Sequence, residues 1–120
     1  MKKTMKKKIR SMKPIRTRLA GVIFDDIPKN IDKFGYKDIG TLALVREPDN
    51  PHDPNAVRVT LFDIWNMGYL PTNVARQVAP IMDEGTDLIA VIVKRNEPYN
   101  GKGNTGLTVD IVENNTGGHL

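Results

Sequence analysis

The sequence VREPDNPHDPNAVRV, residues 45–59, joins two strand-like pieces through a polar corner. Prolines recur at every third position of this corner, at Pro48, Pro51 and Pro54. Each proline fixes its own φ angle and keeps the residue before it out of the helical region. The corner therefore cannot form a helix, and it loses little chain entropy when it becomes ordered. This composition is typical of a structural turn, and it also fits a binding loop that presents preset polar side chains.

The residues on either side of the corner predict a mainly β domain. Alternating and apolar runs place strands at 15–24, 41–46, 56–62, 67–70, 88–94 and 107–112. The strand at 88–94 is apolar enough to be buried on both faces, whereas the alternation at 107–112 predicts one solvated face. The connection at 25–40 is expected to be a loop with one helical turn. Phe62 and Trp65 are expected to cover the core or a turn.

A single helix is predicted after Pro71, because the residue pattern changes there from strand to helix. Its apolar face carries Val74, Val78 and Met82, four residues apart. Thr72 or Asn73 is the expected N-cap, Pro80 is expected to tighten or kink the last turn, and Gly85 should follow the helix. Small sheets close or cover their edges, so we expect a six-stranded barrel with one α-helix inserted after the fourth strand.

Length and composition limit the protein to one domain of 120 residues without cysteine. Disulfides, thiolate nucleophiles and cysteine-based zinc sites are therefore excluded. No apolar run approaches the length of a membrane span, so we expect a soluble, cytoplasmic protein without membrane contact. Residues 1–18 carry nine basic side chains and no acidic one, whereas the rest of the chain has a net charge of −5. This asymmetry predicts a flexible basic arm at 1–14, a domain at 15–113 and a frayed tail at 114–120.

Three pieces of the sequence together resemble the HIRAN domain family. They are the corner REPDNPHDPNAV at 46–57, the run Gly68-Tyr69-Leu70-Pro71, and Val74-Ala75 followed by Ala79-Pro80. The resemblance covers about residues 16–112 and implies an OB-like barrel that binds nucleic acid and is not an enzyme. It further implies recognition of single-stranded DNA with a free 3′ end, and an association with DNA repair or replication. Because the family occurs fused to helicases or as stand-alone proteins, a helicase or another protein is an expected partner.

The resemblance also assigns roles to individual residues around the corner. Asp53 would accept a hydrogen bond from the terminal 3′-hydroxyl, and Asn50 would contact the terminal nucleotide. His52 falls where the family has a base-stacking Tyr, Tyr69 where it has a His near phosphate, and Thr72 where it has a Lys. The complete predicted set of nucleic-acid-binding residues is Arg16, Arg18, Arg46, Asp49, Asn50, His52, Asp53, Tyr69 and Thr72. The aromatic residue that the family carries in the first strand is missing, because Leu19 follows Arg18.

Other chemical interpretations of the corner have weaker support. Asp49, His52 and Asp53 could ligate a hard cation, but the glycine and the terminal glutamate of a calcium loop are missing. His52 and Asp53 lack a nucleophile placed by sequence, so we expect neither catalysis nor a cofactor or metal. The glycine-rich run at 101–106 fits a hairpin turn better than a phosphate-binding loop, since no helix follows it. Two further functions stay open: RNA binding, and a protein-interaction or assembly domain that keeps the fold without DNA binding.

Overall fold

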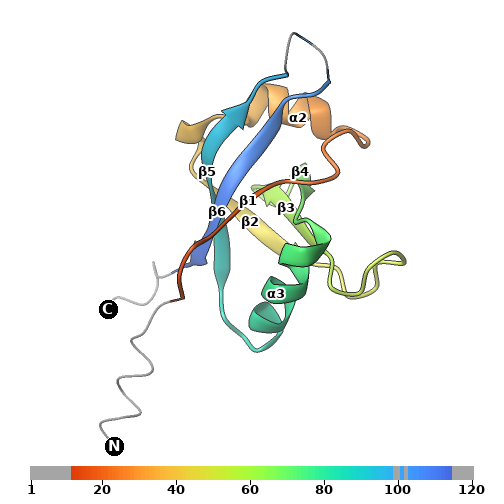
Figure 1. The fold of residues 1–120 in the computed structure, drawn as a ribbon, viewed down its shortest axis with the longest axis vertical. Coiled ribbons are helices and arrows are strands. Elements are labelled where there is room, and N and C mark those ends of the chain that lie inside the picture. The colour runs from red at the N-terminus through yellow and green to blue at the C-terminus, as the bar shows by residue number, and fades with distance from the viewer. Residues whose placement is uncertain (1–11, 99–100, 102, 115–120) are drawn as a thin grey trace, which may run out of the picture.

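The structure, a computed structural model, describes residues 12–98, 101 and 103–114 (Figure 1). In this part of the chain, six antiparallel strands form one sheet in the order β1-β6-β5-β2-β3-β4. The strands are β1 (Ile15–Arg18), β2 (Thr41–Arg46), β3 (Val57–Leu61), β4 (Trp65–Tyr69), β5 (Leu88–Asn96) and β6 (Gly106–Glu113). The helical elements are α2 (Ile27–Phe34), the 3₁₀ turn η1 (Lys37–Ile39) and α3 (Thr72–Asp83). α2 and α3 lie at opposite ends of the sheet (Figure 1).

The sheet curls into a half-barrel because the chain after β1 returns to the edge strand β4. Ala20 N–H donates a hydrogen bond to the Tyr69 carbonyl at 2.7 Å, and Tyr69 N–H donates to the Ala20 carbonyl at 2.9 Å. Gly68 lies beside this contact with a φ angle of +138°, where the β3–β4 pairing shifts register. The prediction of a mainly β, OB-like fold with a helix inserted after the fourth strand is confirmed in this partly open form.

The core lies inside the curl and follows the alternation of the strands. The apolar side chains that are fully buried in β3 and β6 are Val57, Val59, Leu61, Leu107, Val109 and Ile111. The prediction of one solvated face for 107–112 is confirmed, since Thr108, Asp110 and Val112 are only partly buried. The strand β5 differs from its prediction, because Ile89, Val91 and Val93 are half-buried while Leu88, Ala90 and Ile92 are buried. Antiparallel sheets commonly cover one face only, and this one leaves the outer face of β5 partly open.

The connection at 25–40 contains the eight-residue helix α2 in place of the expected loop with one helical turn. Ile27 and Ile31, four residues apart, are 1% and 0% exposed and attach α2 to the core. Asn30 donates a hydrogen bond from Nδ2 to the Asn66 carbonyl in β4 at 2.9 Å. A helix this short is stabilised by such tertiary contacts more than by its own residue pattern, which is why the pattern did not predict it.

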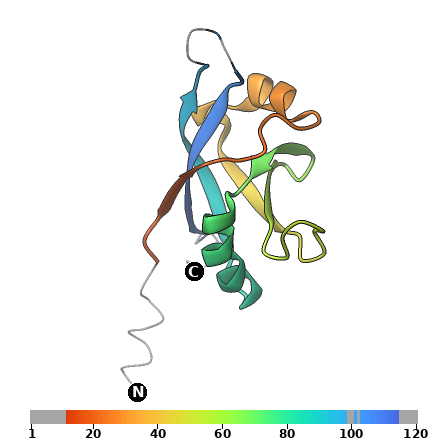
Figure 2. The ribbon, with the colours of Figure 1, turned by 45° about the vertical axis from the view of Figure 1, so that its right-hand side comes forward.

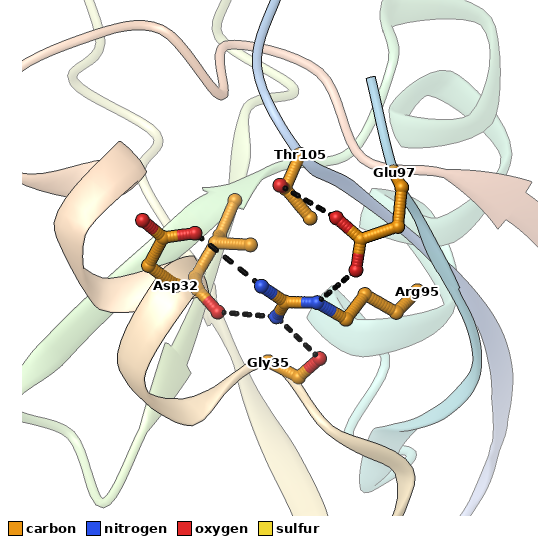
Figure 3. Close-up of polar contacts among 6 residues, drawn as sticks. Asp32, Gly35, Arg95, Glu97 and Thr105 are labelled. Carbon is orange, nitrogen blue, oxygen red and sulfur yellow. Dashed lines mark hydrogen bonds and ion pairs between the residues drawn. The ribbon is translucent and has the colours of Figure 1, made fainter. Parts of the chain in front are cut away.

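Arg95 of β5 holds the C-terminal end of α2 against the sheet (Figure 3). Its Nη1 donates to the Ile31 carbonyl at 2.9 Å and to the Gly35 carbonyl at 3.2 Å. Its Nη2 lies 3.3 Å from Asp32 Oδ1, and its Nε donates to Glu97 Oε2 at 2.8 Å. The last carbonyls of a helix carry partial negative charge, so a guanidinium is favourable at this end. Arg95 thereby fixes the C-terminal end of α2 against β5.

The helix α3 begins where it was predicted, but its N-cap prediction was wrong. Pro71 occupies the N-cap position, and neither Thr72 nor Asn73 provides a side-chain cap. The Pro71 carbonyl instead accepts hydrogen bonds from Val74 N–H at 2.9 Å and Ala75 N–H at 2.8 Å. Pro80 lies within the helix, and a glycine with positive φ, Gly85, follows its end as expected.

The turn between β3 and β4 shows that the expected covering role of Phe62 was wrong. Phe62 and Asp63 have φ angles of +56° and +58°, the values of a type I′ turn, and Phe62 is 67% exposed. Its side chain instead borders a surface pocket that residues of β2 and β5 also line. Trp65 is partly covered, because its ring packs on Phe34 at 5.2 Å between centroids.

The ends of the chain lie mostly outside the described residues. This applies to the predicted basic arm at 1–14, of which only residues 12–14 are described, and to the predicted tail at 114–120. Met12 N–H donates a hydrogen bond to Glu113 Oε2 at 2.8 Å. No helix in the described part of the chain is long and apolar enough to cross a membrane.

An ion pair between β2 and α3 predicts an acid-dependent contribution to stability. Arg46 donates from Nε to Asp83 Oδ1 at 2.9 Å and from Nη2 to Oδ2 at 3.1 Å. These hydrogen bonds lower the pKa of Asp83 below its ordinary value of 3.8. A carboxylate with a lowered folded-state pKa stabilises the fold above its unfolded pKa and loses this effect as pH falls through the folded pKa.

We therefore expect Asp83→Asn to lower the melting temperature slightly at neutral pH, because exposed ion pairs contribute little. The difference from wild type should shrink to nothing as the pH falls below 3.8. Thermal unfolding followed by circular dichroism over an acid titration measures both values. Glu84→Gln, at the next position and exposed, is the matched control without this pH-dependent difference. A difference for Asp83→Asn that stays constant in acid would contradict the ion-pair explanation.

Candidate nucleic-acid interface

A cleft of about 560 Å³ opens beside the polar corner. Three segments that are distant in sequence form its walls: the corner, the connection at 20–27, and the junction of β4 with α3. Figure 2 shows the corner and the connection on the same side of the molecule. The lining residues are Ala20, Gly21, Phe24, Asp25, Ile27, Asn50, His52, Asp53, Ala56, Tyr69, Leu70 and Thr72. The cleft is thus apolar for much of its surface, with a few polar groups from the corner, as ligand sites commonly are.

The corner keeps its shape through hydrogen bonds of its own side chains. Asn50 Oδ1 accepts from His52 N–H at 2.8 Å and from Asp53 N–H at 3.2 Å. Asp53 Oδ1 accepts from Asn55 N–H at 2.9 Å. The other carboxylate oxygen of Asp53, Oδ2, has no hydrogen-bond partner among the described residues. Asn50 is therefore used mainly to hold the bend, whereas Asp53 keeps one acceptor for a ligand in the cleft that it lines.

Glu47 joins the corner to the wall formed by β4. Its Oε1 accepts from Asn50 Nδ2 at 3.0 Å, and its Oε2 accepts from the Tyr69 hydroxyl at 3.3 Å. Arg58 Nε forms an ion pair with the same Oε2 at 3.0 Å. Burial raises the pKa of Tyr69 above its ordinary value of 10, and the charge of Glu47 and the hydrogen bond to it raise that pKa further. The Tyr69 phenol is thus a protonated donor at neutral pH, held in place by Glu47.

The structure brings five of the nine predicted residues together. Those that line the cleft are Asn50, His52, Asp53, Tyr69 and Thr72. Asp49 is exposed on the other side of the corner, beside a shallower pocket. The roles that the resemblance implies for these side chains stay predictions.

The three predicted arginines lie outside the cleft lining. Arg16 forms an ion pair with Asp110 of β6 at 2.8 Å, and Arg46 pairs with Asp83 and also donates to the Ala56 carbonyl at 2.9 Å. Arg18 lies beside β6, where a Cβ added at Gly106 would come within 3.2 Å of its Nη2. Charge alone did not reveal that Arg16 and Arg46 have carboxylate partners within the fold.

Seven of the twelve lining residues were not predicted from the sequence, and Phe24 and Asp25 are the two among them that bring an aromatic ring and a charge. Both were placed at or just after the end of a strand at 15–24, but β1 ends at Arg18. Gly21, with a φ angle of +67°, turns the chain away from the sheet. A glycine inside a strand pattern is a known signal for such a break, and it was the available clue.

The charge of the cleft is negative. Asp25 and Asp53 contribute carboxylates, and the lining contains no lysine or arginine among the described residues. In the part of the chain that the structure describes, no three acidic or histidine side chains gather as metal ligands, so Asp49, His52 and Asp53 do not converge on a cation site. The cleft is therefore suited to an uncharged, hydroxyl-bearing group better than to a phosphate.

The profile of one protein family, the HIRAN domain, matches residues 28–111. The chain belongs to the HIRAN domain family. The match covers β2 to β5, α3, and most of α2 and β6, so it includes the corner and the β4–α3 wall of the cleft but not the connection at 20–27. HIRAN domains are nucleic-acid-binding modules and are generally not catalytic.

Two solved structures share the fold of this HIRAN domain. A crystal structure of a protein from Lactobacillus plantarum aligns with a TM-score of 0.67 and 19% identity, over 86% of this chain and 92% of that one. The crystal structure of the HIRAN domain of human HLTF aligns with a TM-score of 0.62 and 20% identity, over 86% of this chain and 76% of that one. A comparison with curated proteins found no match.

Proposed function

We propose that this HIRAN domain binds single-stranded DNA at a free 3′ end and takes the terminal nucleotide into the cleft. The observation that carries the proposal is the Asp53 carboxylate, which lines the cleft and retains an unused acceptor oxygen. A terminal 3′-hydroxyl is a donor of the right kind for that oxygen. The apolar lining supplied by Leu70, Ile27 and Ala56 suits the sugar and base.

The absence of cationic side chains from the described lining limits what the cleft accepts. A 3′-phosphate would bring negative charge toward Asp25 and Asp53 and would remove the hydroxyl donor. The phosphodiester backbone would then be contacted outside the cleft, where Arg18 is a candidate. RNA binding was left open by the sequence, so an RNA end is compared as an alternative ligand in the same assay.

We expect an oligonucleotide with a 3′-hydroxyl to bind at least about tenfold more tightly than the same oligonucleotide with a 3′-phosphate, the loss of one charge-assisted hydrogen bond being about 1.5–3 kcal/mol. Fluorescence anisotropy with an internal label measures both dissociation constants at one salt concentration. A pair that differs only in a 5′-phosphate serves as the control and should bind alike. Equal affinity for the two 3′ ends would refute end recognition.

A second candidate function is docking to a protein partner, which the turn between β3 and β4 supports. Phe62 and Ile64, two positions apart in this turn, are 67% and 69% exposed, and exposed apolar surface is common at interaction sites. Residues 19–120 also carry a net charge of −5, which opposes nucleic acid. Capture of a specific protein partner by a folded protein that retains no oligonucleotide at low salt would favour this second function over the first.

A further inference from the structure

The segment between β1 and α2 holds Phe24 in a defined position at the rim of the cleft. Ala20 is fixed to Tyr69 by the two backbone hydrogen bonds described above. Phe24 N–H then donates to the Gly21 carbonyl at 3.2 Å, and the Phe24 carbonyl accepts from Ile27 N–H at 3.0 Å. Hydrogen bonds therefore fix the chain on both sides of Phe24, and Ile27 anchors it in the core. A residue in such a tight turn loses little further freedom on binding a ligand.

The ring of Phe24 is left largely uncovered although it lines the cleft. Phe24 is 59% exposed, whereas most large apolar residues of this sheet are fully buried. A Cβ added at Gly21 would lie 3.5 Å from Phe24 Cδ2 and 3.5 Å from Tyr69 Cδ1, so both rings approach this glycine. The backbone next to the ring is also unusual, because Asp25 has a φ angle of +49° without being glycine. Aspartate adopts this left-handed region more readily than most residues, so the turn beside the ring is compact without marked strain.

At the first-strand position where the resemblance implies an aromatic residue, this chain has no ring that could stack on a base. Leu19 is 6% exposed and belongs to the core, so it presents no surface to a ligand. Phe24 lies five residues further along the chain, lines the cleft and has an aromatic ring that is 59% exposed. Aromatic side chains bind bases by stacking without preference for sequence, since every base has a π face.

We propose that Phe24 is the stacking platform for the terminal base of the bound strand, beside Tyr69. This inference rests on the proposed function, because it assumes that the 3′-terminal nucleotide occupies the cleft. Asp53 then holds the hydroxyl while Phe24 covers the base, so the end of the strand is recognised without reading its sequence. The domain consequently accepts all four terminal bases.

The test compares Phe24→Leu, Phe24→Trp and wild type on two oligonucleotides. One carries a normal 3′-terminal nucleotide, and the other carries an abasic 3′-terminal sugar with a free hydroxyl. Phe24→Leu keeps apolar bulk and removes the π face, so we expect about tenfold weaker binding of the normal strand. It should bind the abasic strand as wild type does, and Phe24→Trp should restore binding of the normal strand. Ile23→Ala is the matched control, because Ile23 is 61% exposed, adjacent in sequence and outside the cleft lining.

The possible outcomes separate this inference from the proposed function. Wild type could prefer a free 3′ end while Phe24→Leu binds the normal strand as tightly as wild type does. In that case the stacking role of Phe24 is refuted and the recognition of the 3′ end is not. If Phe24→Leu lowers the affinity for the normal and the abasic strand by the same factor, Phe24 shapes the cleft and does not stack on a base. If wild type binds neither strand, both proposals are overturned. Melting curves of Phe24→Leu and Phe24→Trp should match wild type, because the ring contributes little to the core.

Discussion

Replacing Asp53 with asparagine should weaken binding of a free 3′ end by about ten- to a hundredfold and leave the fold intact. The physical reason is the loss of a hydrogen bond from the terminal hydroxyl to a charged acceptor, which contributes about 1.5–3 kcal/mol. Asparagine keeps an oxygen that can accept from Asn55 N–H, as Asp53 Oδ1 does at 2.9 Å. The corner therefore keeps its turn, whereas the second oxygen becomes an NH₂ group that cannot accept.

Anisotropy titrations with 3′-hydroxyl and 3′-phosphate strands, together with melting curves, measure this effect. Asp53→Asn should reduce binding of the free end far more than binding of the blocked end. Asp49→Asn is the matched control, since it removes the same charge from the same corner but outside the cleft lining. Should Asp53→Asn weaken both ends alike, the hydroxyl role would be wrong and Asp53 would act only through the charge of the cleft.

Gly68→Ala should destabilise the domain by about 2–4 kcal/mol, because strain and crowding each cost about 1–3 kcal/mol. Gly68 has a φ angle of +138°, which side chains rarely adopt. An added Cβ would lie 3.0 Å from the Ala20 carbonyl oxygen and 3.2 Å from Leu19 Cβ. It would therefore push the chain after β1 away from β4, at the contact that closes the half-barrel.

Urea unfolding followed by circular dichroism measures the free energy of unfolding of this variant. Gly85→Ala provides the control, because Gly85 also has a positive φ angle, +103°, but nothing lies within 4 Å of its added Cβ. This control isolates the backbone strain, about 1–3 kcal/mol. The surplus loss in Gly68→Ala then reports the crowding against Ala20. If the two variants lost the same free energy of unfolding, the chain after β1 would move away from β4 without a measurable cost, and the crowding explanation would be wrong.

The corner and its flanking strands could be predicted from sequence because local rules decide them. Three prolines exclude a helix at 47–54, and the strand expected at 41–46 has those bounds in the structure. The alternation in β6 likewise follows from burial of one face. Such features depend on residues that are close in sequence, so the local sequence pattern is enough to predict them.

The rest of the site depends on contacts between distant segments, which a local pattern does not contain. The cleft needs Phe24 and Asp25 to meet Tyr69 and Asp53, and this follows from the Ala20–Tyr69 contact and the turn at Gly21. An arginine likewise looks the same in sequence whether it faces solvent or pairs with a distant carboxylate. The link from Glu47 to Tyr69 belongs to the same class, since 22 positions separate these residues.

Glu47 has a consequence for how fast a ligand is captured. Its two oxygens connect Asn50 and Tyr69 before any ligand arrives, so the corner and the opposite wall already have fixed positions. A receptor that needs no rearrangement has no conformational step to slow association. We therefore expect binding by simple collision, with the lifetime of the complex, and not the speed of its formation, setting differences in affinity between strand ends.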